Sequence, residues 1–499
     1  MNSVSQSSDV VTPPVAVIDI GSNSIRLVVY EGAVRAPIAI FNEKILCGLG
    51  QDLNETGLLD ADGVERALQA IPRFIEIAQG MKVAWIEVLA TAAVREAENG
   101  PEFVSRLEES CNITINILTG REEARLAGLG VLAGTPEAEG IAGDLGGGSV
   151  ELVRVSPDAV GDKETLPLGP LRLGHLLTDG RDGLEAYIEE HLDTVDWLKG
   201  ACGQGAFYVV GGAWRNIAKI HMAAVDYPLH VIHHYAVPRD EMLAFTDKLS
   251  RLTVDEARKL DGGSKRRSET LPYAALLLNR VIAKLQPEEV VFSANGVREG
   301  CVFERVSEEL QREDPLLAAC QRMPWSRTIG RVEGDLLAHW IEVVFNGVDG
   351  RHKRLQHAAC LLSEVGRLEH PDYRVDHALT RVMRFQFVGI DHVERAFLAL
   401  AVASRYGKTI GAARSRSSVE QLLSKEEKAL ARATGFAIRL GFAISGGVSR
   451  NLKLYHLERD GDHLRLVADS KKRQMMGEVV ERRLATLAEA LECSWSIEC

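Results

Sequence analysis

Two short stretches of the chain combine a strand, a carboxylate and a tight turn. In the first, Asp19 lies near the end of an apolar strand and precedes Gly21-Ser22-Asn23-Ser24; in the second, Asp144 precedes Gly146-Gly147-Gly148-Ser149, and Glu151 follows. Glycines in such turns let backbone N–H groups converge on an anion. Carboxylates beside the turn suit a hydrated divalent cation next to phosphate. One such turn alone is more often a plain hairpin, but two predict a phosphate site built from both.

A glycine pair and two arginines are further candidates for holding phosphate. Gly211-Gly212 lies where an apolar strand meets a helix, so its amides would point at an anion from the helix N-terminus. Arg95 can contact phosphate oxygens through two N–H groups at once. Arg298 can do the same, although an arginine at the start of a helix is as often a surface residue.

The composition is that of a globular protein of several domains. The chain has 499 residues, 46% hydrophobic and 26% charged, which predicts roughly three domains. No apolar run reaches the ~20 residues of a membrane span, and residues 1–14 read as a loose, disordered tail rather than a signal peptide. Eight scattered cysteines without a CxxC pair favour a reducing cytoplasm and argue against a disulfide framework or a zinc site.

The net charge of −12 is unevenly distributed. Residues 321–499 carry 28 Lys and Arg against 22 Asp and Glu, whereas residues 1–320 carry 30 against 48. An acidic body with a mildly basic C-terminal part is compatible with a phosphate-rich substrate that touches both. The basic runs lack interleaved aromatic residues, and aromatic content is only 6%, so nucleic acid is not an expected partner.

The hydrophobic pattern predicts two similar α/β segments followed by a helical one. Each of the ranges 15–140 and 141–312 reads as strands around a glycine turn, then helices alternating with strands. Thr91 is placed to cap the short helix that carries Arg95, and Thr119 with Glu122 forms a capping-box pattern. Residues 312–324 read as a linker. Residues 320–499 read as mostly helical, with a hairpin that turns at Asp460-Gly461.

These blocks together resemble the exopolyphosphatase / guanosine pentaphosphate phosphatase (Ppx/GppA) family of the actin-like ATPase superfamily. The resemblance implies an α/β fold of two actin-like (ribonuclease H-like) lobes with a cleft between them. It also implies a C-terminal, mostly α-helical domain distantly related to HD phosphohydrolases. The blocks that carry it are Val17–Ser24, Ala90–Arg95, Gly120–Arg125, Asp144–Glu151, Val210–Gly212 and Gly296–Gly300.

The resemblance also assigns roles to single residues. It places Glu123 as the residue that orients and deprotonates the attacking water; a carboxylate that only complements the helix dipole is the structural alternative. Arg95 is the second residue expected to take part in catalysis, through its contact with phosphate oxygens. Asp19, Asp144 and Glu151 would bind Mg²⁺ directly or through water. The run Lys265, Arg266 and Arg267 is similar to a family position that contacts the distal phosphates, although most such runs are solvated surface charges. Asn295 stands where the family commonly has aspartate, so a metal or ribose role is not expected there.

The remaining basic and metal-ligand patterns are weaker. Arg351–Arg354 and Lys471–Arg473 are compositional candidates for a track that holds a long polyanion. Cys360–Gly366 lies where an HD domain would carry its His-Asp pair, which is missing, so neither metal nor catalysis is expected from this domain. His230, His233 and His234 lack the further ligands of a metal site.

The sequence therefore predicts a cytoplasmic, Mg²⁺-dependent exopolyphosphatase that releases terminal orthophosphate from inorganic polyphosphate. Guanosine pentaphosphate is the rival substrate, because the turns contact phosphates alone. A non-catalytic regulator that binds polyphosphate or nucleotide is a rival from another class, against which the carboxylates Glu123, Asp144 and Glu151 argue. A sugar kinase or heat-shock-type ATPase is less favoured, since no adenosine-binding signature is visible. The family also suggests a homodimer.

Overall fold

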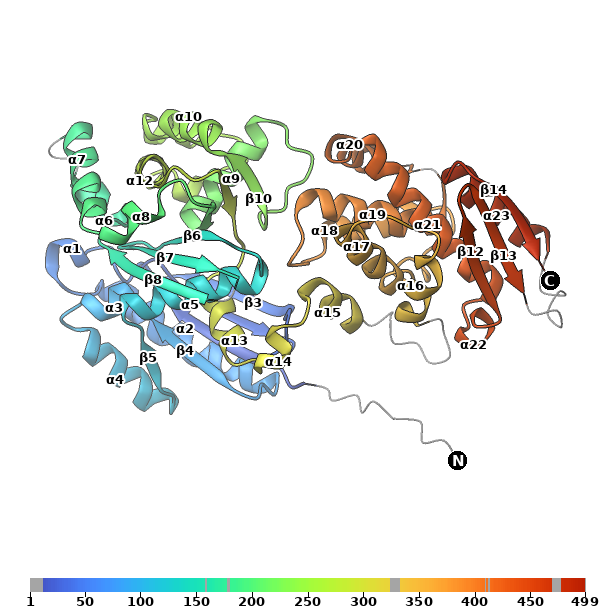
Figure 1. Cartoon of the computed structure of the whole chain (residues 1–499). Coiled ribbons are helices and arrows are strands. Elements are labelled where there is room, and N and C mark those ends of the chain that lie inside the picture. The colour runs from blue at the N-terminus through green and yellow to red at the C-terminus, as the bar shows by residue number, and fades with distance from the viewer. Residues whose placement is uncertain are drawn as a thin grey trace. The chain divides into compact units, whose positions relative to one another are not determined.

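The computed structural model describes residues 12–157, 159–176, 180–323, 333–408, 410–411, 413–468 and 477–498. The chain divides into two compact units, Met1–Arg312 and Glu313–Cys499 (Figure 1). Nearly all of the predicted N-terminal tail, and the basic run Lys471–Arg473, lie outside the described residues. Among those described, no helix is long and apolar enough to cross a membrane.

The first lobe is built on a five-stranded sheet. Its strand order is β3-β2-β1-β4-β5, in which β2 is antiparallel to β1 and β3, and β4 is parallel to β1 and β5. The strands are β1 (Val15–Ile20), β2 (Ser24–Tyr30), β3 (Ala39–Leu46), β4 (Ile86–Ala90) and β5 (Ile115–Ile117). The helices are α1 (Leu53–Thr56), α2 (Ala61–Gly80), α3 (Ala92–Glu96), α4 (Gly100–Cys111) and α5 (Gly120–Gly134).

The second lobe repeats this topology and adds an edge strand. Its order is β10-β11-β9-β6-β7-β8, so that β8-β7-β6-β9-β11 corresponds to β3-β2-β1-β4-β5. The strands are β6 (Gly140–Leu145), β7 (Val150–Ser156), β8 (Ala159–Leu166), β9 (Ala206–Val210), β10 (Tyr235–Pro238) and β11 (Glu289–Phe292). The helices are α6 (Pro170–His175), α7 (Gly180–Asp193), α8 (Asp196–Ala201), α9 (Gly212–Ala224), α10 (Arg239–Ser250), α11 (Val254–Ala257), α12 (Leu271–Leu285), α13 (Val297–Glu304) and α14 (Glu308–Gln311).

The additional strand β10 has no counterpart in the first lobe. Its four residues end in proline, which cannot donate to a sheet and is confined to edges. That short edge strand pairs antiparallel with β11 and covers what would otherwise be an open side of the second sheet.

Strand register places the charged residues of each sheet in a row. In the first lobe Asp19 pairs with Arg26, and Arg26 pairs with Lys44. In the second, Asp144 pairs with Glu151, which pairs in turn with Thr165. Residues paired directly across antiparallel strands lie on the same face of the sheet. Each aspartate therefore has the side chains of its two neighbouring strands beside it.

Helices α5 and α13 connect the two lobes. Helix α5 of the first lobe packs against β7 and β8 of the second, while α13 of the second packs against α5 and β1 (Figure 1). The helices approach closely: a Cβ on Gly300 would lie 1.9 Å from the Leu126 carbonyl oxygen, and one on Gly130 would lie 2.1 Å from that of Gly296. This crossing brings the first turns of both helices to the cleft between the sheets.

The second unit is mostly helical and ends in a small sheet of order β12-β13-β14. Its helices are α15 (Pro315–Arg322), α16 (Gly334–Glu342), α17 (Gly350–Leu361), α18 (Arg374–Arg384), α19 (His392–Tyr406), α20 (Ala413–Leu422), α21 (Lys425–Ser445), α22 (Ser449–Leu452) and α23 (Glu478–Ala490). Its strands are β12 (Tyr455–Asp460), β13 (His463–Ala468) and β14 (Ser494–Glu498). The hairpin turn at Asp460-Gly461 is confirmed, with Gly461 in the left-handed region at φ 54°.

The prediction of a linker over residues 312–324 is wrong, because α15 occupies most of it. Its proline lies at the first helical position, where a missing N–H costs nothing, and the Asp314 carboxylate caps the helix by accepting from Leu317 N.

Candidate active site

The two glycine turns face each other across the cleft. A Cβ on Gly147 would lie 3.1 Å from the Cβ of Ser22, so the tips of the turns are in contact. The amides of Gly21 and Gly146 close their own turns, onto the carbonyl oxygens of Ser24 (3.1 Å) and Ser149 (3.0 Å). These two amides are therefore not free for phosphate, contrary to the expectation. Within the described residues of these two turns, no acceptor is found for the amides of Ser22, Asn23, Gly147, Gly148 and Ser149.

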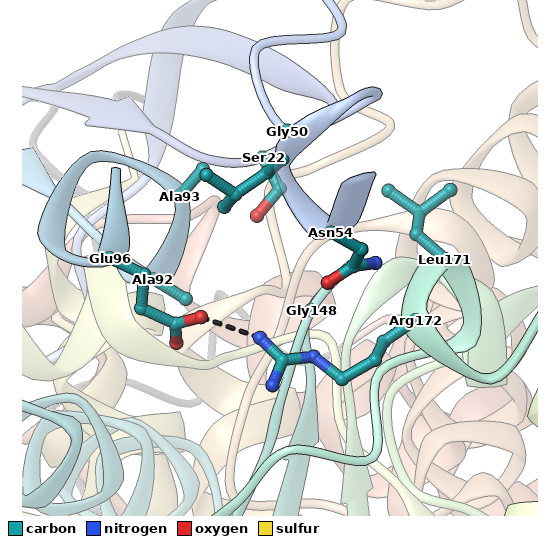
Figure 2. Close-up of a pocket in the computed structure, with 10 residues that line it drawn as sticks. Ser22, Gly50, Asn54, Ala92, Ala93, Glu96, Gly148, Leu171 and Arg172 are labelled. Carbon is teal, nitrogen blue, oxygen red and sulfur yellow. Dashed lines mark hydrogen bonds and ion pairs between the residues drawn. The ribbon is translucent and has the colours of Figure 1, made fainter. Parts of the chain in front are cut away.

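A pocket opens beside the two turns, between the lobes. It encloses about 270 Å³ of empty space, part of it open to solvent. Ser22 and Asn54 line it from the first lobe and Gly148 from the second, and it is bounded by Glu96 of α3 and Arg172 of α6 (Figure 2). The described structure thus places the turn residues Ser22 and Gly148 on the wall of an opening that is continuous with solvent.

Four carboxylates, termed here the cleft carboxylates (Asp19, Glu123, Asp144 and Glu151), interact across the lobes. Burial, followed by the charge of Asp144, raises the pKa of Glu123 to about 8. Burial also raises the pKa of Asp144 to about 6, against the opposing effect of Arg215. In both carboxylates the effect of burial outweighs that of the nearby arginines, so the neutral form is favoured in the absence of a cation.

Glu151 is the most isolated of the four. Its side chain is 1% exposed, and neither carboxylate oxygen makes a hydrogen bond of normal geometry within the described structure. Burial and the charge of Glu123 raise its pKa well above the usual range, although the nearby Ser149 side chain lowers it somewhat. A buried carboxylate without donors is costly unless a proton or a cation compensates it.

Arg95 connects the predicted catalytic base to the pocket. Its Nη1 donates to the Leu118 carbonyl at 2.7 Å and lies 3.4 Å from Oε2 of Glu123. The capping box that orients α5 is confirmed, with the Glu122 carboxylate accepting from Thr119 N at 2.8 Å. The expected cap by Thr91 is not formed, because its hydroxyl points to the Ile20 carbonyl of β1 instead.

Two predicted site residues bind each other. Nη1 of Arg298, expected to contact phosphate, donates at 2.9 Å to Oδ2 of Asp19, expected to bind the cation. The next residue, Glu299, accepts from the Tyr30 hydroxyl at 2.6 Å and from Gly296 N at 2.9 Å. These contacts fix the first turn of α13 against β1 and β2, so Arg298 neutralises Asp19 in this state.

Five basic side chains gather beside the cleft carboxylates and are termed the cleft cations. The pKa values of four of them, Arg26, Lys44, Arg215 and Arg267, are lowered by at least one other member, and the fifth, Arg298, acts on three of these four. Loss of hydration and the nearby Arg267 and Arg26 lower the pKa of Lys44 to about 8. The cluster comprises Arg26 and Lys44 of the first lobe, and Arg215, Arg267 and Arg298 of the second.

Sequence reasoning missed three of these, Arg26, Lys44 and Arg215. The position of Arg26 could have been predicted. In a hairpin that turns at Gly21–Ser24, counting outward along both strands pairs Arg26 with Asp19. Lys44 lies beside Arg26 because β3 pairs with β2, and Arg215 reaches the cluster because of how α9 packs. Neither arrangement can be recognised from a local sequence pattern.

The glycine pair Gly211-Gly212 lies at the start of α9, as predicted. Gly211 has φ 98°, a conformation that side chains rarely adopt, and a Cβ there would lie 3.1 Å from Oδ1 of Asp144. A Cβ on Gly212 would lie 2.2 Å from a guanidinium nitrogen of Arg267, which therefore covers this helix N-terminus. Lys265 and Arg266, by contrast, are exposed.

The donor set fits a hydrated divalent cation. Among the described residues, no three His, Cys, Asp or Glu side chains form a ready metal-ligand cage. Mg²⁺ commonly uses only one or two carboxylates together with water and substrate phosphate. The orphaned carboxylate of Glu151 and its strand partner Asp144 provide such a pair, next to free backbone amides.

In the second unit, the arginines of the basic run Arg351–Arg354 form ion pairs. Arg351 is paired with Asp391 and Glu394, and Arg354 with Asp314. The expectation that this run holds a long polyanion stays a prediction.

The remaining weak candidates carry no metal-ligand set. In the segment where an HD domain would have ligands, Glu364 accepts from Arg405 at 2.6 Å. His233 lies 3.2 Å from the Gly134 carbonyl oxygen.

Comparison with known proteins agrees with this geometry. The sequence profile of the Ppx/GppA phosphatase family matches residues 16–309, and that of the exopolyphosphatase C-terminal domain matches residues 337–493. Exopolyphosphatase 1 of Mycobacterium tuberculosis is 26% identical over 309 residues, covering 59% of this chain and 88% of that protein. Retrograde regulation protein 2 of Saccharomyces cerevisiae is 27% identical over 463 residues, covering 82% and 76%.

Solved structures give the same fold for the two lobes. The Aquifex aeolicus member of the Ppx/GppA family aligns with a TM-score of 0.51 at 24% identity, covering 58% of this chain and 97% of that one. An exopolyphosphatase from Cytophaga hutchinsonii aligns with a TM-score of 0.53 at 21% identity, covering 59% and 99%. The α/β prediction of two actin-like lobes followed by a helical domain is confirmed. By its profile match and its paired lobes, the chain belongs to the Ppx/GppA phosphatase family.

Proposed function

We propose that this family member is an exopolyphosphatase that releases orthophosphate from the end of inorganic polyphosphate. The observation that carries the proposal is the set of five cleft cations beside the two phosphate turns. The turns would bind the terminal phosphoryl group through their amides, and the rest of a polyanion needs positive charge next to it. A substrate with a single phosphate would leave most of these cations unused.

The chemistry requires a positioned water rather than a covalent intermediate. Glu123 accepts a proton from the water as its oxygen bonds to the terminal phosphorus, and the bridging P–O bond breaks. The electron pair of that bond leaves with the shortened chain. The raised pKa of Glu123, about 8, suits a base that takes up a proton near neutrality.

The other residues hold the reacting group. Arg95 contacts Glu123 and would also bind phosphate oxygens. The free amides of Ser22, Asn23, Gly147 and Gly148 would surround the terminal phosphoryl group from both lobes. Asp144 and Glu151 would hold Mg²⁺, with Asp19 joining if Arg298 releases it; when bound, the cation supplies charge neutralisation for the phosphates.

One assay tests the proposal against its rival substrate. Purified protein with Mg²⁺ is given long-chain polyphosphate or guanosine pentaphosphate at equal concentrations of phosphoanhydride ends, and orthophosphate release is followed. We expect polyphosphate to be hydrolysed with the higher kcat/KM, because the cleft cations can engage successive phosphates. Faster release from guanosine pentaphosphate would contradict the substrate assignment while keeping the site.

A regulatory role is the second candidate, favoured by one specific observation. The yeast regulation protein aligns over both units of this chain, whereas the Mycobacterium tuberculosis relative aligns over 59% of it. A protein that binds polyphosphate tightly but releases no orthophosphate from either substrate would support this second role.

A further inference from the structure

An ion pair between the lobes forms one wall of the pocket beside the phosphate turns. Oε2 of Glu96, at the end of α3, lies 2.5 Å from Nη2 of Arg172 in α6 (Figure 2). Figure 2 shows the Ser22 hydroxyl and the Asn54 amide pointing toward the same space as this pair. An acidic side chain in a pocket suited to phosphate needs an explanation, because it repels the anion that the amides attract.

The position of Arg172 is set by the second turn itself. The amides of Gly169 and Leu171 donate to the carbonyl oxygens of Gly148 (3.1 Å) and Gly147 (3.0 Å), so α6 starts directly on that turn. The Nε–H of Arg172 is buried and donates to no acceptor in the described structure. Arg172 is thus rigidly attached to the turn and retains an unused donor.

Glu96 also contacts the arginine that orients the proposed base. Its Oε1 lies 3.9 Å from Nη2 of Arg95, whose Nη1 lies 3.4 Å from Glu123. Alternating charges therefore run from Glu123 through Arg95 and Glu96 to Arg172. A phosphate at the turns would lie beside two guanidinium groups that one carboxylate currently occupies.

We propose that Glu96 is a built-in competitor for phosphate, which yields Arg172 to the terminal phosphoryl group and reclaims it as orthophosphate leaves. The proposal rests on the proposed function and deepens it, because it assigns the orthophosphate-binding group and the means of product release. Charge-assisted contacts of arginine to phosphate and to carboxylate are similar in strength, so the exchange requires no large change in free energy. Glu96 thereby promotes the dissociation of orthophosphate, the product, from Arg172.

The direct test is orthophosphate binding to the full chain, measured by titration calorimetry with Mg²⁺ present. Glu96→Gln keeps the size of the side chain and removes its charge. We expect Kd for orthophosphate to fall by about tenfold, the scale of one charge-assisted contact. Unchanged or weaker binding by Glu96→Gln would overturn the proposal, as would binding too weak to measure in that variant.

A matched control separates this effect from the general loss of negative charge. Glu304 also forms a 2.5 Å pair between the two lobes, with Arg125, but it does not line the pocket. We expect Glu304→Gln to leave Kd within about twofold, since exposed charges at a distance are screened by salt. A tightening equal to that of Glu96→Gln would show that net charge alone is responsible, and would overturn the proposal.

A double variant tests whether the two residues act on each other. Arg172→Met should weaken orthophosphate binding by about tenfold, and adding Glu96→Gln to it should restore little. An equal gain from Glu96→Gln with and without Arg172 would contradict the exchange. Because binding is measured without polyphosphate, a protein that passes these tests but hydrolyses no polyphosphate would refute the proposed function alone.

Discussion

The two lobes have the same strand order but opposite charges beside the cleft. In the first lobe the strand partners of Asp19 are the cations Arg26 and Lys44 in succession. In the second lobe the partners of Asp144 are Glu151 and then the neutral Thr165. The paired strands of the two lobes therefore carry a basic row in one sheet and an acidic row in the other. We term the five cleft cations the basic wall and the four cleft carboxylates the acidic wall; each wall takes residues from both lobes. Under the proposed function, the phosphate chain would lie along the basic wall and the attacking water beside the acidic wall.

The largest effect should come from the acidic wall. Replacing Glu123 by Gln removes the proton acceptor, and kcat should fall by about 10²- to 10⁴-fold, the usual contribution of a general base. Polyphosphate binding should stay close to that of the unchanged protein, because the basic wall is intact. Stopped-time assays of orthophosphate release and a separate binding titration measure both quantities. Normal turnover in this variant would remove the base from the mechanism.

The pH profile should report the same carboxylate. Because Glu123 must be ionised to accept a proton, log(kcat/KM) should rise with unit slope as the pH increases toward its pKa and then level off. That midpoint should lie between ~4.3, the value for an unperturbed glutamate, and about 8, where burial and Asp144 place the pKa without a cation. A profile that is flat from pH 4 to 9 would contradict this assignment.

A cation of the basic wall can be displaced without replacing any charged residue. A methyl group on Gly212 would collide with the Arg267 guanidinium, so Gly212→Ala should displace that cation. We expect KM for long-chain polyphosphate to rise by roughly tenfold, the scale of one charge-assisted contact, with kcat nearly constant. Gly200→Ala, in the same lobe with open space around it, is the control and should leave both parameters unchanged. A change in kcat alone would place Arg267 in the chemistry instead.

The smallest predicted effect concerns how α5 presents Glu123. Thr119→Ala removes one half of its capping box and should lower the free energy of unfolding by about 1 kcal/mol. Thr253→Ala removes the same box from the short helix α11, away from the cleft. Denaturant titrations should show a loss of stability in both variants, but activity should fall only in Thr119→Ala. Equal activity in the two would mean that the cap has no role in positioning the base.

Much of this organisation was predictable from local sequence, for identifiable reasons. The turns at Gly21 and Gly146, the strand β9 and the capping box at Thr119 depend on residues within a few positions of one another. Apolar strands, glycine turns and caps are local patterns, and the internal repeat made the second lobe easier to recognise.

The electrostatic partners could not be predicted in the same way. Arg298 was expected to contact phosphate, yet it neutralises Asp19, which lies far from it in sequence. The pairing of Glu96 with Arg172 likewise depends on how α3 and α6 approach across the cleft. Side chains of opposite charge that meet through tertiary packing leave no periodic trace in the sequence. The same reason explains why Arg351 and Arg354, a basic run by composition, are in fact paired with acids.

The central claim is that the basic wall binds the substrate and the acidic wall carries out the chemistry. It is tested most directly by comparing the kinetics of two variants on long-chain polyphosphate. Arg26→Met and Glu151→Gln alter residues at corresponding positions of the two lobes, each paired with its lobe's aspartate. We expect Arg26→Met to raise KM with little change in kcat, and Glu151→Gln to lower kcat by about 10²-fold or more with little change in KM. If both substitutions change the same parameter to a similar extent, the two walls do not have separate roles and the account is wrong.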